Sequence, residues 1–253
     1  MKETLYTIPL TDAFNAGDEC PFCFVERKVE QDTLDLVLGS SASYMESDMR
    51  EMTDKAGFCR THFKKMFDYG NTLGNAWILK THYLQMEKEL SEKIKMFSPG
   101  KASLLNKIKK TESTENAVNA WLKEKEASCY ICNSYQKTYE RYMDTFFFMY
   151  KKDGQMKQMI KDSKGFCLYH FGEIVSRIET ALPGAEKEEL YTLLFTQMEE
   201  NLKRVGEDVA WLIEKFDYRN KDADWKNSKD AVQRGMQKLW GGYPADPPYQ
   251  QSK

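Results

Sequence analysis

All six cysteines of the chain and two of its three histidines fall into one spacing pattern that occurs twice. In each copy a Cys-x2-Cys pair is followed, after 35 residues in the first copy and 34 in the second, by a Cys-x2-His pair. Thiolates and imidazoles in such pairs are the usual ligands of Zn²⁺, which takes four of them in a tetrahedron. The two ligand sets are Cys20, Cys23, Cys59 and His62, and Cys129, Cys132, Cys167 and His170.

We expect each copy to close on itself around one ion, which gives two zinc ions per chain. A Cys-x2-His pair at the start of a helix presents both ligands on one face, and a helix N-terminus also favours the thiolate. The residues between the pairs suffice for one helix leading away and a shorter helix leading back. Four protein ligands leave no open coordination position, which indicates structural rather than catalytic sites.

Two other chemistries fit parts of the pattern. A Cys3His set can hold an iron–sulfur cluster in place of zinc. Cys20-Pro-Phe-Cys23 resembles the dithiol of glutaredoxins, but that motif follows a strand, and no strand is predicted before Cys20. The duplicate pair, from Cys129 to Cys132, lacks the proline. The third histidine, His82, has no ligand partner at helical spacing, so we expect it to face solvent or the edge of the core.

The likeness between the copies extends beyond the ligands. The tripeptide Gly-Phe-Cys begins both Cys-x2-His pairs, and a phenylalanine follows both histidines. The segment QMEKEL, from Gln85 to Leu90, matches QMEENL, from Gln197 to Leu202, 112 residues further on. We interpret this as a tandem duplication of a unit of roughly a hundred residues.

Helices must position these ligands. Long segments rich in Glu, Lys, Met, Leu and Ala, with only 14 Gly and 7 Pro in 253 residues, predict an all-α fold. We expect two tandem helical repeats, each closed by a Cys3His metal site, followed by a long C-terminal helix and a helical tail. The expected domains are 1–100, 101–216 and 217–253, the last ending in a flexible segment.

Helix boundaries follow from glycines, prolines and apolar periodicity. A long helix from about Ala185 has an apolar seam that continues to Phe216, and Ser228 is the expected N-cap of a last helix. The stretch 101–114 is the expected connection between the repeats, and the proline-rich end is expected to be extended or disordered. The other expected helices are about 22–38, a short one before Gly57, 59–97 with a break between Gly70 and Gly74, 130–150, 155–164 and 167–181.

Charge and hydropathy exclude several classes of protein. The formal charge is −2, and each Cys3His site with a divalent ion adds −1, so the loaded chain carries about −4. Such a charge disfavours nucleic acid as a partner. No apolar run approaches the roughly 18 residues of a membrane span, and the N-terminus lacks a secretory h-region. We expect a cytoplasmic protein, whose reducing compartment favours metal or thiol chemistry over structural disulfides.

The duplicated CxxC…GFCxxH pattern, together with the C-terminal stretch EKFDYRNKDADWKNSKDAVQRGMQKLWGG, resembles an uncharacterised bacterial family, number 6062 among the domains of unknown function. The likeness covers nearly the whole chain. It implies that both Cys/His quartets are metal ligands, and it brings no activity with it.

Three functions remain open from the sequence. We favour a non-enzymatic, zinc-stabilised scaffold that binds a protein or a small molecule, because no nucleophile–base motif is present. The alternatives are an enzyme with a site in a cleft between the repeats, and a thiol-based metal or redox sensor that uses the same ligands. The residues expected to border that cleft, if the C-terminal motif is more than packing, are Asp217, Tyr218, Arg219 and Trp225.

Overall fold

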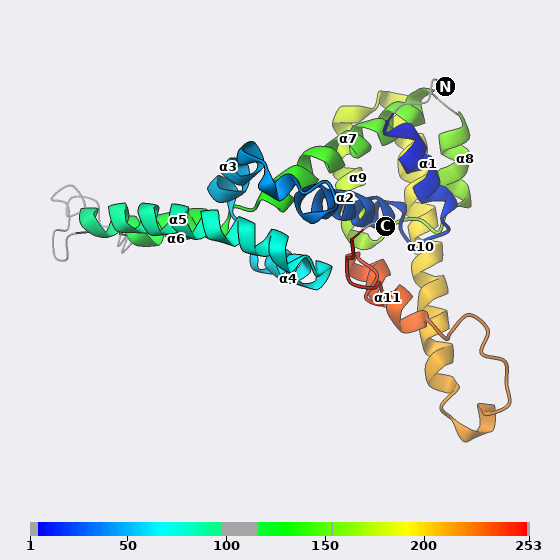
Figure 1. Cartoon of the computed structure of the whole chain (residues 1–253). Coiled ribbons are helices and arrows are strands. Elements are labelled where there is room, and N and C mark those ends of the chain that lie inside the picture. Colours follow the sequence, from blue (N-terminus) through cyan, green and yellow to red (C-terminus); the bar gives the residue numbers. More distant parts are fainter. Residues whose placement is uncertain (1–4, 98–115, 153, 252–253) are drawn as a thin grey trace, which may run out of the picture. The chain divides into compact units, whose positions relative to one another are not determined.

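The computed structural model describes residues 5–97, 116–152 and 154–251, and helices are the only regular elements within these ranges (Figure 1). The all-α class is therefore confirmed. The α-helices are α1 (Thr7–Asn15), α2 (Pro21–Leu38), α3 (Ser47–Ala56), α4 (Arg60–Tyr69), α5 (Thr72–Met96), α6 (Ala117–Glu126), α7 (Tyr130–Lys152), α8 (Gly154–Asp162), α9 (Leu168–Ala181), α10 (Gly184–Glu214) and α11 (Ala231–Trp240), with short 3₁₀ helices η1 (Ser43–Met45) and η2 (Tyr218–Asn220).

The chain divides into two compact units, each built from two separate segments. Unit 1 comprises Met1–Val29 and Lys137–Pro247, and unit 2 comprises Glu30–Gln136 and Pro248–Lys253. The sequence predicted consecutive domains instead, with boundaries after residues 100 and 216. The observed boundaries fall within α2 and α7, because each of these helices contributes residues to both units.

Local sequence explains where the helices break. Gly57 ends α3 with φ of 63°, and Gly70 ends α4 with φ of 87°, both in the left-handed region that favours glycine. Asn71 then caps α5 by accepting a hydrogen bond from the backbone N–H of Gly74 at 2.8 Å. The predicted break between Gly70 and Gly74 is confirmed.

The core of unit 1 is largely aromatic. Phe22, at the start of α2, packs edge-on against Phe146 of α7 with ring centroids 5.6 Å apart, and against Tyr139 at 5.8 Å. Phe14 of α1 stacks on Phe146 at 6.4 Å. Such contacts add to the burial energy of large rings. They surround the start of α2, where Cys20 directly precedes the helix and Cys23 lies in its first turn.

The core of unit 2 packs α2, α3, α4 and α5 around a mixed aliphatic and aromatic centre. Leu34, Leu38, Met66 and Ile78 are at most 1% exposed. Cys129 belongs to the same cluster of buried residues. The apolar core and the ligand pair of α7 therefore support each other.

Three details differ from the sequence-based expectation. Ser228 does not cap α11; its hydroxyl donates to the carbonyl of Trp225 at 2.7 Å, and the N-cap position belongs to Asp230. Phe216, the last residue of the predicted apolar seam, is 81% exposed, because α10 ends at Glu214. The extended C-terminal end contains Tyr249, which is buried in unit 2. The predicted connection at 101–114 lies outside the described residues.

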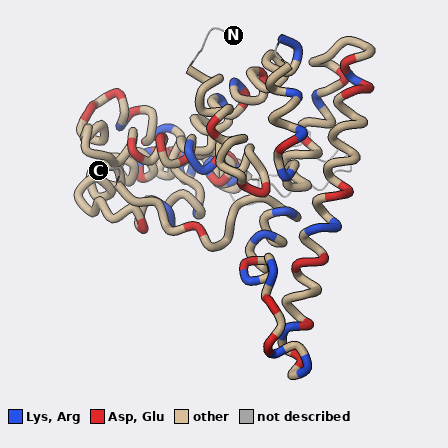
Figure 2. Tube along the Cα trace, turned by 90° about the vertical axis from the view of Figure 1, so that its right-hand side faces the viewer, with Lys and Arg blue, Asp and Glu red and all other residues tan. Residues whose placement is uncertain are grey.

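The distribution of charge along the helices and the hydropathy of the helices agree with the expectations from the sequence. Lysine and arginine alternate with aspartate and glutamate along the helices (Figure 2). Of the helices that the structure describes, none combines the length and the apolar character that crossing a membrane requires.

Candidate metal centres

The first ligand cluster lies entirely in unit 1, where the start of α2 meets the start of α9. The Nδ1 atom of His170 is 3.3 Å from the Cys20 sulfur, 3.6 Å from the Cys23 sulfur and 3.1 Å from the Cys167 sulfur. The sulfurs of Cys23 and Cys167 are 3.8 Å apart. All four residues are buried.

The second cluster lies entirely in unit 2, where the start of α4 meets the start of α7. The Nδ1 atom of His62 is 3.2 Å from the Cys59 sulfur and 3.3 Å from both the Cys129 and the Cys132 sulfur. The sulfurs of Cys59 and Cys132 are 3.9 Å apart. His62 and Cys129 are buried, whereas Cys59 and Cys132 are partly open to solvent.

These separations fit one tetrahedral ion in each cluster. A tetrahedron with bonds of about 2.3 Å to sulfur and about 2.0 Å to nitrogen has edges of about 3.8 Å between sulfurs and about 3.5 Å between sulfur and nitrogen. The observed edges of 3.8 and 3.9 Å between sulfurs match closely, and those of 3.1 to 3.6 Å between sulfur and nitrogen lie within about 0.4 Å of the ideal value. The ligands of an iron–sulfur cluster attach to different iron atoms, which requires wider spacing.

The grouping of the ligands corrects the expectation that each copy closes on itself. Each cluster combines the Cys-x2-Cys pair of one copy with the Cys-x2-His pair of the other. The two helices between the ligand pairs differ in length, since α2 has 18 residues, about 27 Å, and α3 only 10, about 15 Å. Likewise, α7 has 23 residues and α8 only 9. In neither copy does the chain return to its own Cys-x2-Cys pair after the second of these helices.

Two glutamates of α2 face the outer ring nitrogens of the two histidines. Glu30 Oε1 is 2.8 Å from His62 Nε2 in unit 2, and it also accepts a hydrogen bond from Lys65 at 2.5 Å. In unit 1, Glu26 Oε1 is 3.2 Å from His170 Nε2, an ion-pair distance without the alignment of a hydrogen bond. A carboxylate behind a histidine fixes the tautomer that leaves Nδ1 free to bind a metal.

The electrostatics of both clusters favour a bound cation. Burial favours the neutral imidazole, but hydrogen bonds to Cys129 and Glu30 outweigh it and raise the pKa of His62 to about 10. Burial likewise opposes ionisation of Glu30, yet hydrogen bonds from His62 and Lys65 lower its pKa to about 2. Hydrogen bonds to Cys167 and Cys20, together with burial, raise the pKa of Cys23 in the other cluster. Hydrogen bonds from Cys20 and Cys23, by contrast, lower the pKa of Cys167 in the same cluster. A positive ion would stabilise the thiolate form of such closely spaced sulfurs.

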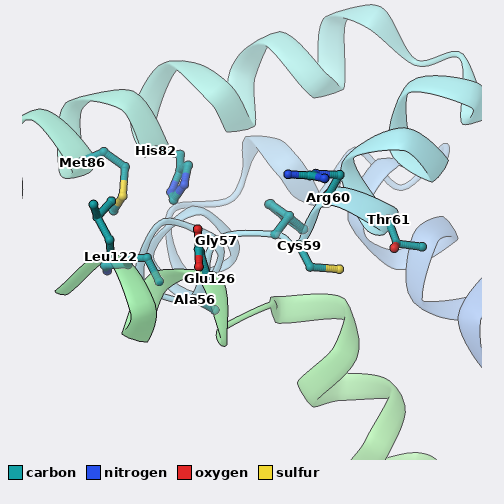
Figure 3. Close-up of a pocket in the computed structure, with 11 residues that line it drawn as sticks. Ala56, Gly57, Cys59, Arg60, Thr61, His82, Met86, Leu122 and Glu126 are labelled. Carbon is teal, nitrogen blue, oxygen red and sulfur yellow. The ribbon is translucent and has the colours of Figure 1, made fainter. Parts of the chain in front are cut away.

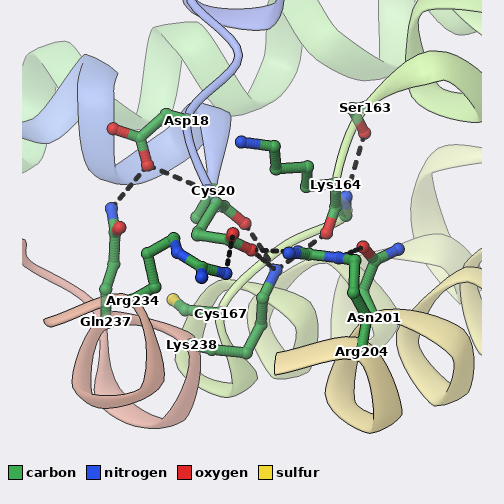
Figure 4. Close-up of polar contacts among 12 residues, drawn as sticks. Asp18, Cys20, Ser163, Lys164, Cys167, Asn201, Arg204, Arg234, Gln237 and Lys238 are labelled. Carbon is green, nitrogen blue, oxygen red and sulfur yellow. Dashed lines mark hydrogen bonds and ion pairs between the residues drawn. The ribbon is translucent and has the colours of Figure 1, made fainter. Parts of the chain in front are cut away.

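Helix α11 covers the first cluster with a buried ionic network (Figure 4). Lys238, 1% exposed, donates to the backbone carbonyls of Glu19 at 2.6 Å and Lys164 at 2.7 Å, and it pairs with the Glu19 carboxylate at 3.1 Å. Arg204 pairs with the same carboxylate at 2.5 Å. Gly241, just after α11, has a φ of 81°, which favours glycine, and a Cβ there would be in van der Waals contact with the Cys167 sulfur at 3.4 Å.

The four residues expected to border a cleft lie in and around η2 and the segment that follows it. Asp217 and Arg219 pair with each other at 2.6 Å in and beside η2, and Tyr218 is 85% exposed. Trp225 forms a cation–π contact with Lys215, whose ammonium lies 5.0 Å from the ring centroid. None of these four residues lines the cavity described next.

A cavity of about 580 Å³ opens in unit 2 beside the second cluster (Figure 3). The predicted free histidine, His82, lies on its wall and is half-buried. Its Nδ1 is 3.1 Å from the carbonyl oxygen of Asp54. A Cβ at Gly57 would lie 3.1 Å from the imidazole, so the glycine leaves room for the ring. The other lining residues are Ala56, Phe58, Cys59, Arg60, Thr61, Met86, Leu122, Lys125 and Glu126.

The supporting carboxylates were missed by the sequence reasoning, although a signal existed. Glu26 and Glu30 follow Cys23 by 3 and 7 residues, which is the spacing of one helical face. Glu19 and Lys238 left no such signal, because they are distant in sequence and meet only in the folded unit.

The fold and the two ligand sets define an all-α protein with two Cys3His clusters. The chain belongs to the Family of unknown function (DUF6062), whose family model matches residues 1–246. The resemblance drawn from the motifs is thereby confirmed. No curated protein and no solved structure matches the chain.

Proposed function

We propose that this protein is a non-enzymatic binding protein whose two helical units are each held together by a structural Zn²⁺ ion. The observation that carries the proposal is the tetrahedral spacing of two complete ligand sets, with sulfur–sulfur edges of 3.8 and 3.9 Å. Four protein ligands leave no position for a substrate or a reactive water. The metal would supply folding energy, and ligand binding would belong to other surfaces.

Metal analysis tests the first half of this proposal. We expect two zinc ions per chain in protein purified without added metal. Replacement by Co²⁺ should give the absorption of tetrahedral thiolate coordination at both sites. Fewer than one metal ion per chain, or iron together with acid-labile sulfide, would contradict the proposal.

The second candidate function is a thiol-based sensor at the second cluster. It is favoured by the partial exposure of Cys59 and Cys132, whose sulfurs are 3.9 Å apart. A hydroperoxide would oxidise the two thiolates to a disulfide; its O–O bond would take up the two electrons and two protons to give water and an alcohol, and the ion would be released. Peroxide titration with a zinc-release readout separates this function from a purely structural one.

The partner class and the compartment complete the proposal. The binding partner would be a protein or a small molecule and not nucleic acid, because acidic and basic side chains alternate along the helices. None of the six cysteines, all of which the structure describes, is in a disulfide, in keeping with a reducing cytoplasm.

A further inference from the structure

The cavity in unit 2 has a lining that separates hydrogen-bond acceptors from donors. His82 and Glu126 lie toward one end, together with Met86 and Leu122, and Arg60 and Thr61 lie toward the other (Figure 3). The volume of about 580 Å³ falls within the range of small-molecule sites. The apolar residues of the lining include Met86, Leu122 and the buried Phe58.

The acceptor end is suited to a cationic group. Because a carbonyl oxygen only accepts hydrogen bonds, the contact of His82 Nδ1 with Asp54 places the proton on Nδ1. The Nε2 atom is then an acceptor, and it lies close to Gly57 at the cavity wall. Glu126 adds a carboxylate that has no partner among the described residues. An ammonium group would satisfy both acceptors.

The donor end is suited to a carboxylate. Arg60 is exposed, and its guanidinium has no acceptor among the residues that the structure describes. Lys125, the other cation of the lining, is already paired with Glu89 at 2.8 Å. The charges left for a ligand are therefore one cation and one anion, toward opposite ends of the cavity. Arginine pairs with carboxylates through two parallel hydrogen bonds.

In unit 1, helix α11 contacts the segments that correspond to those around this cavity. There the segments before Cys20 and after Lys164 contact α11, with Gln237 donating to Asp18 at 2.5 Å and Lys238 donating to the Lys164 carbonyl at 2.7 Å. The corresponding segments of unit 2 line the cavity, and no helix of that unit takes the place of α11 among the described residues.

We propose that this cavity binds a small apolar zwitterion, a free amino acid or a short peptide, with the ammonium group at His82 and Glu126 and the carboxylate at Arg60. The inference rests on the proposed function as a binding protein and names its ligand class. The partly exposed Cys59 lines the same cavity, so the ligand would lie next to the second metal cluster.

The test measures binding of four probes to the zinc-loaded full chain by calorimetry: leucine, leucyl-leucine, N-acetyl-leucyl-leucine and leucyl-leucine amide. We expect at least one of the two zwitterions to bind with Kd below about 1 mM, and each blocked dipeptide to bind at least about tenfold more weakly than leucyl-leucine. Comparing the Kd of leucine with that of leucyl-leucine shows whether the cavity prefers a free amino acid or a short peptide. If neither zwitterion binds, the inference is overturned.

Variants assign the two ends. Arg60→Gln should weaken the binding of leucyl-leucine about tenfold or more and leave the binding of the amide unchanged. Glu126→Gln should weaken the binding of leucyl-leucine by a similar factor and leave the binding of the acetylated dipeptide unchanged. Arg219→Gln, which removes an exposed arginine outside the cavity, is the matched control. Equal weakening of charged and blocked probes would contradict the assignment. Zinc content measured on the same samples separates failure of this inference from failure of the metal sites.

Discussion

The two metal clusters share their ligand types and spacing but differ in how the protein covers them. In unit 1 all four ligands are buried, and α11 with Gly241 lies over Cys167 and Cys23. In unit 2 two of the cysteines reach solvent, and a cavity opens beside Cys59. The same set of ligands, three cysteines and one histidine, therefore lies in a buried environment in unit 1 and in a partly exposed one in unit 2. The metal in unit 1 should be slow to exchange, and the metal in unit 2 should remain accessible.

The buried cluster also has the greater electrostatic support. Three thiolates, an imidazole and Zn²⁺ carry a net charge of −1, which is costly to bury without a counter-charge. Lys238 lies at this cluster and is 1% exposed. Burial lowers its pKa, whereas the charges of Glu19 and Cys20 oppose that effect. In unit 2, solvent screens part of the same charge.

The largest effect should come from removing a ligand of the buried cluster. Structural zinc supplies an apparent 10–16 kcal/mol or so in small zinc modules, which is comparable with the stability of a domain. Cys167→Ser should therefore lose cooperative unfolding and much of its helix content, as measured by circular dichroism. Cys132→Ser should keep its helix content and lose up to one metal ion per chain, because solvent can replace an exposed ligand.

His82→Ala is the control for both cysteine variants, since it changes a half-buried side chain without removing a ligand. It should unfold like the parent. If Cys132→Ser collapses as completely as Cys167→Ser, the two clusters do not differ in the way that their burial indicates.

Chelator kinetics provide the second test of the comparison. A coloured zinc chelator in excess should remove one ion quickly, from the cluster that contains Cys59 and Cys132. The second ion, surrounded by buried ligands, should leave at least about tenfold more slowly, because release requires local opening of the unit. Cys132→Ser should abolish the fast phase only. A single phase for both ions would show that burial does not control exchange.

Lys238→Met should have a smaller but substantial effect. The substitution leaves the carboxylate of Glu19, which is 2% exposed, paired with Arg204 and Arg234 only. It also removes the donor to two backbone carbonyls, one buried and one part-buried. We expect a loss of about 3 kcal/mol in the free energy of unfolding, measured with urea. The exposed Lys229→Met is the matched control and should change stability by less than about 0.5 kcal/mol.

The helices were largely predictable from the sequence, because their determinants are local. Gly57, Gly70 and the apolar periodicity of α10 give boundaries that the structure reproduces within a few residues. Helices α1 and α6 were not predicted, since both are short and border segments without strong periodicity. The ligand residues were also predictable, because spacing alone indicates which side chains bind metal.

The pairing of the ligands was not predictable in the same way. Either Cys-x2-Cys pair can share an ion with either Cys-x2-His pair without violating any spacing. The choice depends on where the helices between the pairs lead the chain. That depends on the lengths of α3 and α8, to which a prediction of boundaries is sensitive. A chain that ended after Phe216 would lack α11 and Gly241. The contacts of Lys238 and Gly241 make the first cluster depend on that missing part.

The smallest expected effect concerns the polar contacts of unit 2 around Glu89. Burial raises the pKa of this carboxyl, but hydrogen bonds from Lys125, Trp121 and Gln85 lower it to about 2. A folded pKa below the usual 4.5 means that the group stabilises unit 2 above pH 4.5 and that this contribution is lost as the pH falls toward 2.

Because acid also strips zinc from its thiolates, salt is the cleaner probe of Glu89 at neutral pH. Solvent screens the partly exposed pair, so Glu89→Gln should cost about 1 kcal/mol in dilute buffer and less at high salt. The control is Glu179→Gln, an exposed carboxylate of unit 1 that pairs with Lys187 at 2.9 Å and should have almost no effect. A loss at Glu89 that does not depend on salt would identify the hydrogen bond from the Trp121 indole, at 2.7 Å, as the main contribution in place of the ion pair.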